Sequence, residues 1–333
     1  MAAALLLAAC GGPTTRGPEA KPVRVGLVFD VGGRGDGSFN DQAATGAERA
    51  TRAGGVTVEY ADAHSDSARS AALSRFAAEG VDLVIGVGFL ASQDATELAR
   101  RYPNVRFAVV DYSLPVDSAG RAMVPPPNLA ALTFREEEGS YLVGALAALT
   151  STSHAVGFVG GMRSPLITKF EAGYEAGVRR VCADCRVLTE YVGDTPDAFR
   201  DAGRARALAE REYASGADVV YHAAGQSGAG VFEAASARNR LAIGVDVDQH
   251  AAAPGHVLTS MVKRIDVAVA DVIGRVHAGE FRGGMQSYGL AEGGVAYVSD
   301  ATTNAHASAA ARERVATLQA GIIAGLVRVP TAR

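Results

Sequence analysis

A glycine-rich loop with three aspartates is the first part of this sequence whose residue types could do chemistry. The loop follows an apolar run ending at Phe29, and residues 30–41 are DVGGRGDGSFND. Glycines permit positive φ and let a backbone approach a ligand closely, while Ser38 or Asn40 could cap a helix that starts here. Phe39 lies between the glycines and the cap. It could pack onto that helix as a hydrophobic staple, or it could serve as a platform for a planar ligand.

Polar or glycine-rich positions also follow other apolar runs of the chain. The runs end near Gly88, Asp111, Gly161, Val192, Ala224 and Asp246. In open α/β sheets, ligands bind outside the carboxyl ends of the strands. These positions are therefore the candidates for lining a binding site.

The segments that must position these residues alternate between strand and helix patterns. Apolar runs at 23–29, 83–88 and 106–111 are separated by helical patterns, for example at 40–53 and 91–101. Strand segments that are almost continuously apolar are typical of a parallel sheet covered by helices on both faces. The second half of the chain repeats this alternation, so we expect an α/β protein.

Three strand-like segments recur after a nearly constant interval. Residues 25–28 are echoed by 156–159, residues 80–84 by 216–220, and the strand ending at Asp111 by the one ending at Asp246. The repeat predicts two lobes wound in the same way, with their strand ends facing a shared cleft. Such a pair is typical of a clamp for a small molecule.

The chain is expected to cross between the lobes three times, near Phe134, Met261 and Gly283. The first lobe would then contain residues 23–134 and 262–282, and the second lobe residues 135–261 and 283–333. Three connecting segments make a hinge that bends while resisting twist, as in proteins that close around a ligand.

The N-terminus resembles the lipobox of bacterial lipoproteins. Residues 5–10 are LLLAAC, and the resemblance implies lipidation of Cys10 and an extracytoplasmic protein anchored to the cell membrane. Residues 1–4 lack the positive charge with which a signal peptide opens, so either the true start lies upstream or the match is accidental. Residues 11–22 are rich in Gly, Pro and Thr, which predicts a flexible tether.

Cys182 and Cys185 form a single CxxC motif. A zinc ribbon needs a second such pair, so we expect no structural metal site. In an oxidising compartment the two cysteines could close a local disulfide that staples a surface loop.

The run GDGSFND at 35–41 resembles the GDxSFN signature of the basic membrane protein family, the substrate-binding lipoproteins of ABC-type importers that include bacterial purine nucleoside receptors. Four further pieces follow in order: AVVDYS at 108–113, GADVVYHAAGQSG at 216–228, GVDVDQ at 244–249 and TSMVKR at 259–264. The resemblance covers essentially everything after the tether. It implies a type I periplasmic-binding-protein fold, in which two doubly wound parallel-sheet lobes are joined by a three-segment hinge and hold a nucleoside between them.

The resemblance also implies the partners and the chemistry. A monomeric receptor would deliver its nucleoside to ABC permease and ATPase subunits, with no cofactor and no catalytic residue. Carried over by position, the family pattern stacks the base between Phe39 and Tyr221 from opposite lobes. Carboxylates and amides would read the base edge, and the candidates are Asp30, Asn40 and Asp111.

Asp246 and Lys263 match the pair that binds the ribose in this family. The neighbouring loop is AGGxG in most members, whereas this chain has Gly225 followed by Gln226. A backbone donor survives that change, although the conformation that glycine allows is then not guaranteed.

Structural roles are open for the same residues. Asp111 could cap a turn, Asp246 and Lys263 could form an ordinary salt bridge, and Tyr221 could pack inside the sheet, because the alternation around it does not settle which face it uses.

Among other protein classes, a net charge of −4 disfavours nucleic-acid binding. The absence of a GxxxxGK[ST] motif excludes the ATP-hydrolysing component of a transporter.

Three further functions remain as alternatives. A ligand-sensing receptor of the same fold would serve a signalling partner instead of an importer. A nucleoside hydrolase is suggested by Asp246 and Asp248, but its N-terminal cluster of aspartates is missing. A sugar-only binder would more often flank its ring with Trp, and this chain has none.

Overall fold

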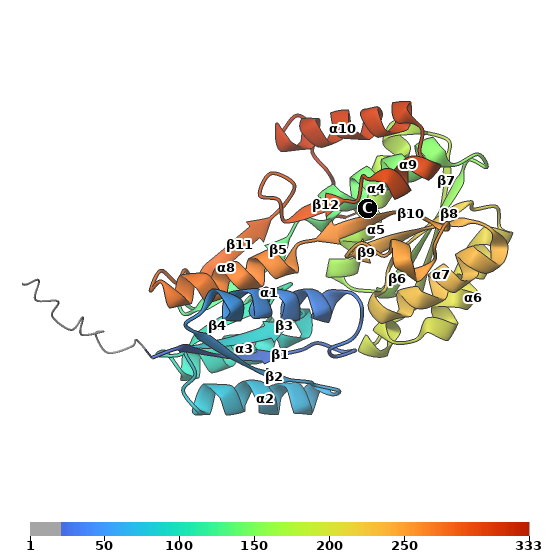
Figure 1. The fold of residues 1–333 in the computed structure, drawn as a ribbon. Coiled ribbons are helices and arrows are strands. Elements are labelled where there is room, and N and C mark those ends of the chain that lie inside the picture. Colours follow the sequence, from blue (N-terminus) through green and yellow to red (C-terminus); the bar gives the residue numbers. More distant parts are fainter. Residues whose placement is uncertain (1–20, 333) are drawn as a thin grey trace, which may run out of the picture.

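The computed structural model describes residues 21–332, which form two lobes that each contain a six-stranded sheet (Figure 1). The predicted lipobox, Cys10 and nearly all of the tether lie outside the described residues. Within the described part of the chain, no helix has the length and apolar character needed to cross a membrane.

The sheet of the first lobe is entirely parallel, with the order β11-β5-β4-β3-β1-β2. Its strands are β1 (Val23–Val28), β2 (Val56–Ala61), β3 (Leu83–Val87), β4 (Arg106–Val110), β5 (Leu129–Phe134) and β11 (Gly284–Tyr288). Helices α1 (Phe39–Ala53) and α8 (Ile265–His277) cover one face, and α2 (Asp66–Ala78) and α3 (Ser92–Arg101) cover the other. The expected alternation of strand and helix is therefore confirmed.

The second sheet has the order β12-β10-β9-β8-β6-β7, and only β12 is antiparallel. Its strands are β6 (Ala155–Met162), β7 (Arg186–Gly193), β8 (Val219–Ala223), β9 (Leu241–Asp246), β10 (Val257–Lys263) and β12 (Val295–Tyr297). Helices α4 (Glu136–Thr150) and α5 (Pro165–Val181) cover one face, and α6 (Ala202–Ala214) and α7 (Gly228–Arg238) cover the other. Two further helices, α9 (Ala301–His306) and α10 (Ala309–Ile323), complete this lobe.

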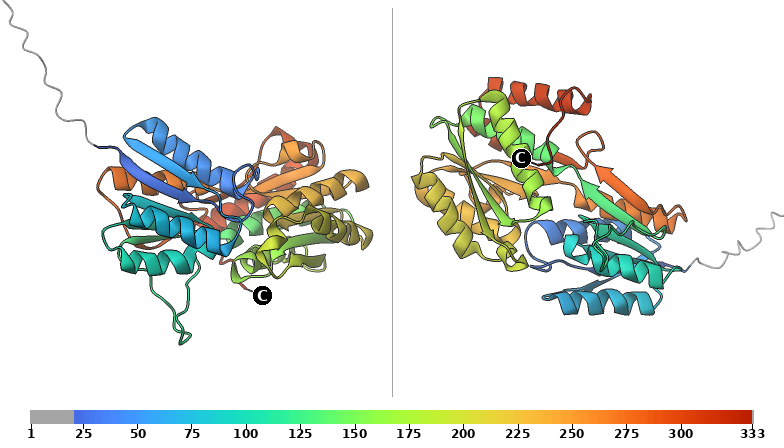
Figure 2. Two further views of the ribbon diagram at one scale, coloured as in Figure 1. Left: turned by 90° about the horizontal axis from the view of Figure 1, so that it is seen from below. Right: turned by 180° about the vertical axis from the view of Figure 1, so that it is seen from behind.

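The connection between β4 and β5 contains no helix. Part of it forms an arm that projects from the first lobe and is closed by an isolated bridge between Val116 and Ala122 (Figure 2). The arm starts just after Asp111, the strand-end carboxylate singled out in the sequence.

The lobes are connected at three places, although two of the expected positions are displaced. The first crossing, at Arg135, is next to the predicted one. The second follows Lys263, because β10 stays in the second sheet to that residue, which pairs with Val295 of β12. The third crossing is not near Gly283: β11 pairs in parallel with β5 and so belongs to the first lobe, and the chain crosses only between Tyr288 and Val295. The reason is that β5 offers a free sheet edge, which β11 covers.

Helices α4 and α5 pack with their backbones close together, because glycines on each helix face the backbone of the other. A Cβ atom on Gly144 would lie 2.2 Å from the carbonyl oxygen of Tyr174. We expect Gly144→Ala to force the helices apart and to lower the free energy of unfolding by about 1–3 kcal/mol. Urea denaturation would measure the change.

Gly274 in α8 provides the matched control. A Cβ atom there meets nothing within 4 Å, so Gly274→Ala should stabilise the protein by about 0.5–1 kcal/mol through helix propensity alone. Equal effects of the two substitutions would contradict the close helix contact.

Candidate functional site

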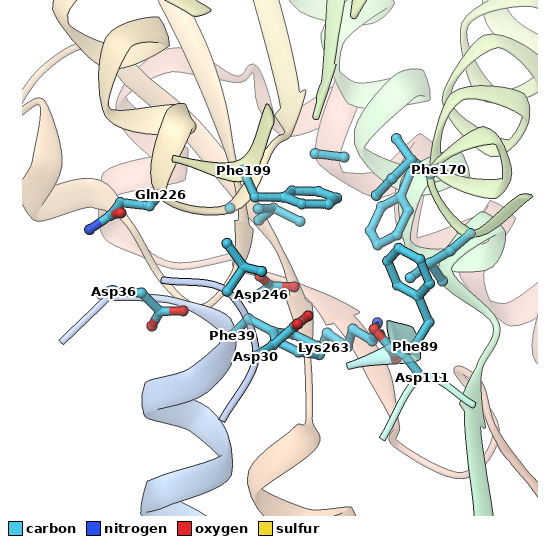
Figure 3. A pocket seen from close by; sticks show the side chains of 16 residues that line it. Asp30, Asp36, Phe39, Phe89, Asp111, Phe170, Phe199, Gln226, Asp246 and Lys263 are labelled. Atoms are coloured by element: carbon cyan, nitrogen blue, oxygen red, sulfur yellow. Dashed lines mark hydrogen bonds and ion pairs between the residues drawn. The ribbon is translucent and has the colours of Figure 1, made fainter. Parts of the chain in front are cut away.

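A cavity of about 590 Å³, partly open to solvent, lies between the two lobes (Figure 3). Its walls come from the carboxyl ends of strands in both sheets, as the strand-end rule predicts. The lining residues used below are Asp30, Asp36, Phe39, Phe89, Asp111, Phe170, Phe199, Gly225, Gln226, Asp246 and Lys263.

Two phenylalanines lie on opposite sides of this cavity. Phe39 is the first residue of α1 in the first lobe, and Phe199 ends the short 3-10 helix Pro196–Phe199 in the second. Figure 3 shows the two rings above and below the space between them. Phe89 and Phe170 close the end of the cavity near Asp111 and Lys263. The arrangement offers a flat slot with apolar walls.

Tyr221 does not take part in this slot, so its predicted stacking role is wrong. Its side chain is fully buried inside the second lobe, with ring centroids 5.2 Å from Tyr174 and 5.6 Å from Phe158. Its hydroxyl lies 3.3 Å from Ser140 Oγ. The physical reason is that Tyr221 lies in the middle of β8 on the face covered by α4 and α5, two residues before the strand reaches the cleft.

Asp111 and Asp246 occupy equivalent places at the cleft ends of β4 and β9, and both have left-handed backbones. Their φ angles are 60° and 67°, and among the described non-glycine residues only His154 and Asn239 share that feature. This conformation is costly for residues with a Cβ and tends to occur at functional sites. Both carboxylates line the cavity.

Lys263 is the centre of a buried charge network. Its side chain is 1% exposed, and Nζ lies 2.6 Å from the Asp111 carboxylate and 2.9 Å from Glu136 Oε1. Glu136 also pairs with Lys169. Burial alone would lower the pKa of Lys263, but the carboxylates of Asp111 and Glu136 outweigh it and raise the pKa above its ordinary value. Lys263 therefore stays charged.

Asp246 is paired differently from the expectation. Its Oδ2 accepts a 2.7 Å hydrogen bond from Ser38 Oγ, and its carbonyl oxygen accepts one from Gln42 Nε2 at 3.1 Å. Both donors belong to the first lobe, so these bonds hold the lobes together in a closed arrangement. Asp246 and Lys263 both line the cavity, but the direct partners of Lys263 are Asp111 and Glu136.

Asp30 offers a hydrogen-bond acceptor inside the cavity. Its Oδ1 is buried and has no hydrogen-bond partner among the described residues. Burial raises the pKa of Asp30 to about 7, and a backbone hydrogen bond from Val31 and the positive charge of Arg69 only partly oppose this. Gly88 makes room for the carboxylate, since a Cβ there would lie 2.0 Å from Asp30 Oδ2. A ligand N–H is the natural partner for such an oxygen.

Asn40 holds the glycine loop and does not line the cavity, so its predicted contact with the base edge is wrong. Its side chain is 1% exposed; its Oδ1 accepts from the backbone N–H of Asp30 at 2.8 Å, and its Nδ2 donates to Asp36 at 3.0 Å. Asp36 also accepts from the backbone N–H groups of Ser38, Asn40 and Asp41. Asp36, rather than Ser38 or Asn40, therefore caps the start of α1.

Gly225 and Gln226 line the cavity as expected, in a short 3-10 helix after β8. Gly225 has φ 54°, so the glycine conformation is used at this position. Gln226 is exposed and lies near Asp36 at the opposite end from Lys263 (Figure 3). The replacement of the usual glycine thus places an amide side chain at the cavity edge.

Comparisons with known proteins identify the family of this chain. The family model described as "ABC transporter substrate-binding protein PnrA-like" matches residues 23–328. The chain belongs to this family. In Lactococcus lactis subsp. cremoris, the "ABC transporter nucleoside-binding protein BmpA" is 31% identical over 99% of this chain and 96% of its own length. "Basic membrane protein A" of Borreliella burgdorferi is 32% identical over 88% of this chain and 84% of its own.

A solved solute-binding protein of an ABC transporter from Aeropyrum pernix K1 has the same fold. It superposes with a TM-score of 0.83 at 31% identity, covering 94% of each chain. The predicted type I periplasmic-binding fold is therefore confirmed. Members of the PnrA-like family are substrate-binding proteins, and the resemblance drawn from five short motifs is confirmed by a match along nearly the whole described chain.

Several residues of this PnrA-like site were not singled out from the sequence: Phe89, Glu136, Phe170 and Phe199. Phe199 had a detectable signal, because it is an aromatic residue in the segment after the strand that ends near Val192, as Phe39 is after the strand that ends at Phe29. Glu136 had none, since three consecutive glutamates at a helix start are ordinary there.

Proposed function

We propose that this protein is a lipid-anchored extracytoplasmic receptor that captures a nucleoside, preferably a purine nucleoside, and delivers it to the permease of an ABC importer. The observation that supports the proposal is the slot between Phe39 and Phe199, with the unpartnered Oδ1 atom of Asp30 at the same cavity. Stacking a base on an aromatic ring is worth about 1–3 kcal/mol per base. Purine edges present N–H donors that a carboxylate accepts.

The ribose would lie near Asp246, whose carboxylate can accept from vicinal hydroxyls, with Lys263 at the same cavity. Closure follows from contacts that a ligand makes with both lobes at once, because only interactions specific to the closed form shift a hinge equilibrium. The anchor is supported by the cysteine at position 10 and by relatives in Pyrococcus species that are named uncharacterized lipoproteins.

Calorimetry with adenosine, guanosine, inosine, uridine and ribose tests the proposal. We expect clear heats with the purine nucleosides, a weaker one with uridine and none with ribose. Binding of ribose without binding of any nucleoside would overturn the stacking model.

The charge of the cavity predicts discrimination against nucleotides. Asp30, Asp36, Asp111 and Asp246 line it, whereas Lys263 is the only Lys or Arg among the described lining residues and is already paired. Repulsion should weaken AMP relative to adenosine by about tenfold or more. Displacement of bound adenosine by AMP would measure the ratio of the two affinities. Equal affinities would contradict the prediction, because they would mean that the phosphate does not lie near these carboxylates.

Nucleoside affinity should also depend on pH. The pKa of Asp30 is raised to about 7 by burial, and the ionised carboxylate accepts an N–H hydrogen bond more strongly than the protonated carboxyl group does. Affinity is therefore complete at pH 8 and should fall as the pH drops through 7, by up to about tenfold per pH unit. Burial also raises the pKa of Asp246, to about 6, which adds a second decline at lower pH.

The variant Asp30→Asn distinguishes the contribution of Asp30 to this pH dependence from that of Asp246. The variant should bind more weakly at pH 8 and lose the decline near pH 7, while keeping the one near pH 6. An unchanged pH profile in Asp30→Asn would show that this carboxylate does not contact the ligand.

A further inference from the structure

Three groups that bind soft metals meet at the end of the second lobe opposite the ligand cavity. His154 immediately precedes β6, while Cys182 and Cys185 lie between the end of α5 and the start of β7. The cysteines are joined in a disulfide. His154 Nδ1 lies 3.7 Å from Cys182 Sγ and 4.0 Å from Cys185 Sγ. The ligand atoms of the three residues all lie within 4.8 Å of one another.

These distances suit tetrahedral coordination. With Zn–S near 2.3 Å and Zn–N near 2.0–2.1 Å, a sulfur and a nitrogen bound to the same zinc are about 3.6 Å apart. Both nitrogen–sulfur distances in the structure are close to that value. Only the two sulfurs must move apart, and breaking their bond frees them to do so.

The backbone holds His154 in this position. Its φ is 55°, a left-handed conformation that is unfavourable for a residue with a side chain. Its carbonyl oxygen accepts a 2.8 Å hydrogen bond from the backbone N–H of Arg186, the residue after Cys185. The imidazole and the cysteine loop are thus fixed to each other through adjacent strands, independently of the disulfide.

We propose that reduction of the Cys182–Cys185 disulfide converts this cluster into a binding site for a thiophilic cation such as Zn²⁺, with Cys182 Sγ, Cys185 Sγ and His154 Nδ1 as ligands and water in the fourth position. An external dithiol supplies the two electrons and two protons that turn the disulfide into two thiols, and is itself oxidised to a disulfide. Metal binding then releases two protons, because cysteine ligates as the thiolate.

Such a site would switch with the redox state of its surroundings. The oxidised protein has no thiolate to offer, so it should not bind the cation here. The cluster precedes β6 and β7, whereas the ligand cavity lies at the other ends of the strands. Metal capture at the cluster is therefore separate from nucleoside binding.

Co²⁺ is a suitable probe, because thiolate coordination gives it an intense charge-transfer absorption and a tetrahedral visible spectrum. The full chain should carry Cys10→Ser, so that only Cys182 and Cys185 contribute thiols. After anaerobic reduction we expect one equivalent of Co²⁺ to bind with thiolate bands and to be displaced by Zn²⁺. The oxidised protein should show neither the charge-transfer absorption nor the tetrahedral visible spectrum.

Two variants assign the ligands. His154→Ala should weaken Zn²⁺ binding by the reduced protein by tenfold or more, and Cys182→Ser with Cys185→Ser should abolish the thiolate bands. His250→Ala is the matched control, because Asp248, His250 and Asp300 form the other cluster of possible metal ligands among the described residues. That variant should leave the thiolate bands and their Zn²⁺ displacement unchanged.

Thermal denaturation gives a second measurement. Zn²⁺ should raise the Tm of the reduced protein and not that of the oxidised protein, since binding to the native state stabilises it. The proposal is overturned if the reduced parent develops no thiolate band, if His154→Ala binds as tightly as the parent, or if reduction alone abolishes the native circular dichroism, because the fold must hold His154 beside the thiols.

Discussion

Replacing Lys263 by Met should destabilise the protein by about 3–5 kcal/mol, the cost of leaving buried carboxylates without their cation. Lys263 lies within 3 Å of both Asp111 and Glu136, and the Glu136 side chain is fully buried. Met has a similar length and keeps the apolar contacts of the side chain, so the loss reports the charge. Urea denaturation at pH 7.5 measures it.

Lys169→Met is the matched control. Lys169 also pairs with Glu136 but is 24% exposed, and Glu136 keeps Lys263 when Lys169 is removed. We expect a loss of at most about 1 kcal/mol, as for other partly exposed ion pairs. If the two variants were equally stable, Lys263 could not be the cation on which the buried carboxylates depend.

Replacing Phe199 by Ala should weaken nucleoside binding by roughly 5- to 150-fold, which corresponds to the loss of about 1–3 kcal/mol of stacking. Phe199 is half-buried at the surface of the second lobe, so the fold should tolerate the change. Phe39→Ala should have an effect of similar size, because the two rings lie on opposite sides of the cavity. Calorimetry with adenosine measures both.

Tyr221→Phe is the control that distinguishes the two candidate aromatics of the second lobe. It removes only the hydroxyl that lies near Ser140, inside the lobe. Nucleoside affinity should stay within a factor of two of the parent. A large loss in Tyr221→Phe together with an unchanged Phe199→Ala would reverse the assignment of the stacking residue.

The fold was largely predictable because its signal is local. Apolar runs separated by helical patterns are properties of neighbouring residues, and the repeated segments around Val25 and Val156 indicated two similar lobes. The strand-end rule then placed Asp30, Asp111 and Asp246 at the cleft without any tertiary information. The third crossing was misplaced because pairing of β11 with β5 depends on an available sheet edge, which no local pattern reports.

The sequence by itself determined the alternating architecture, the two-lobed plan and the carboxylates at the strand ends, because each follows from periodicity along the chain. Only the tertiary structure decided which aromatic faces Phe39, which acid pairs with Lys263, and that His154 lies beside Cys182 and Cys185. These outcomes depend on how far each residue lies from the end of its strand and on which helix covers that face. The place of a residue along its strand and the helix that covers it are both set by packing between segments that are distant in the chain.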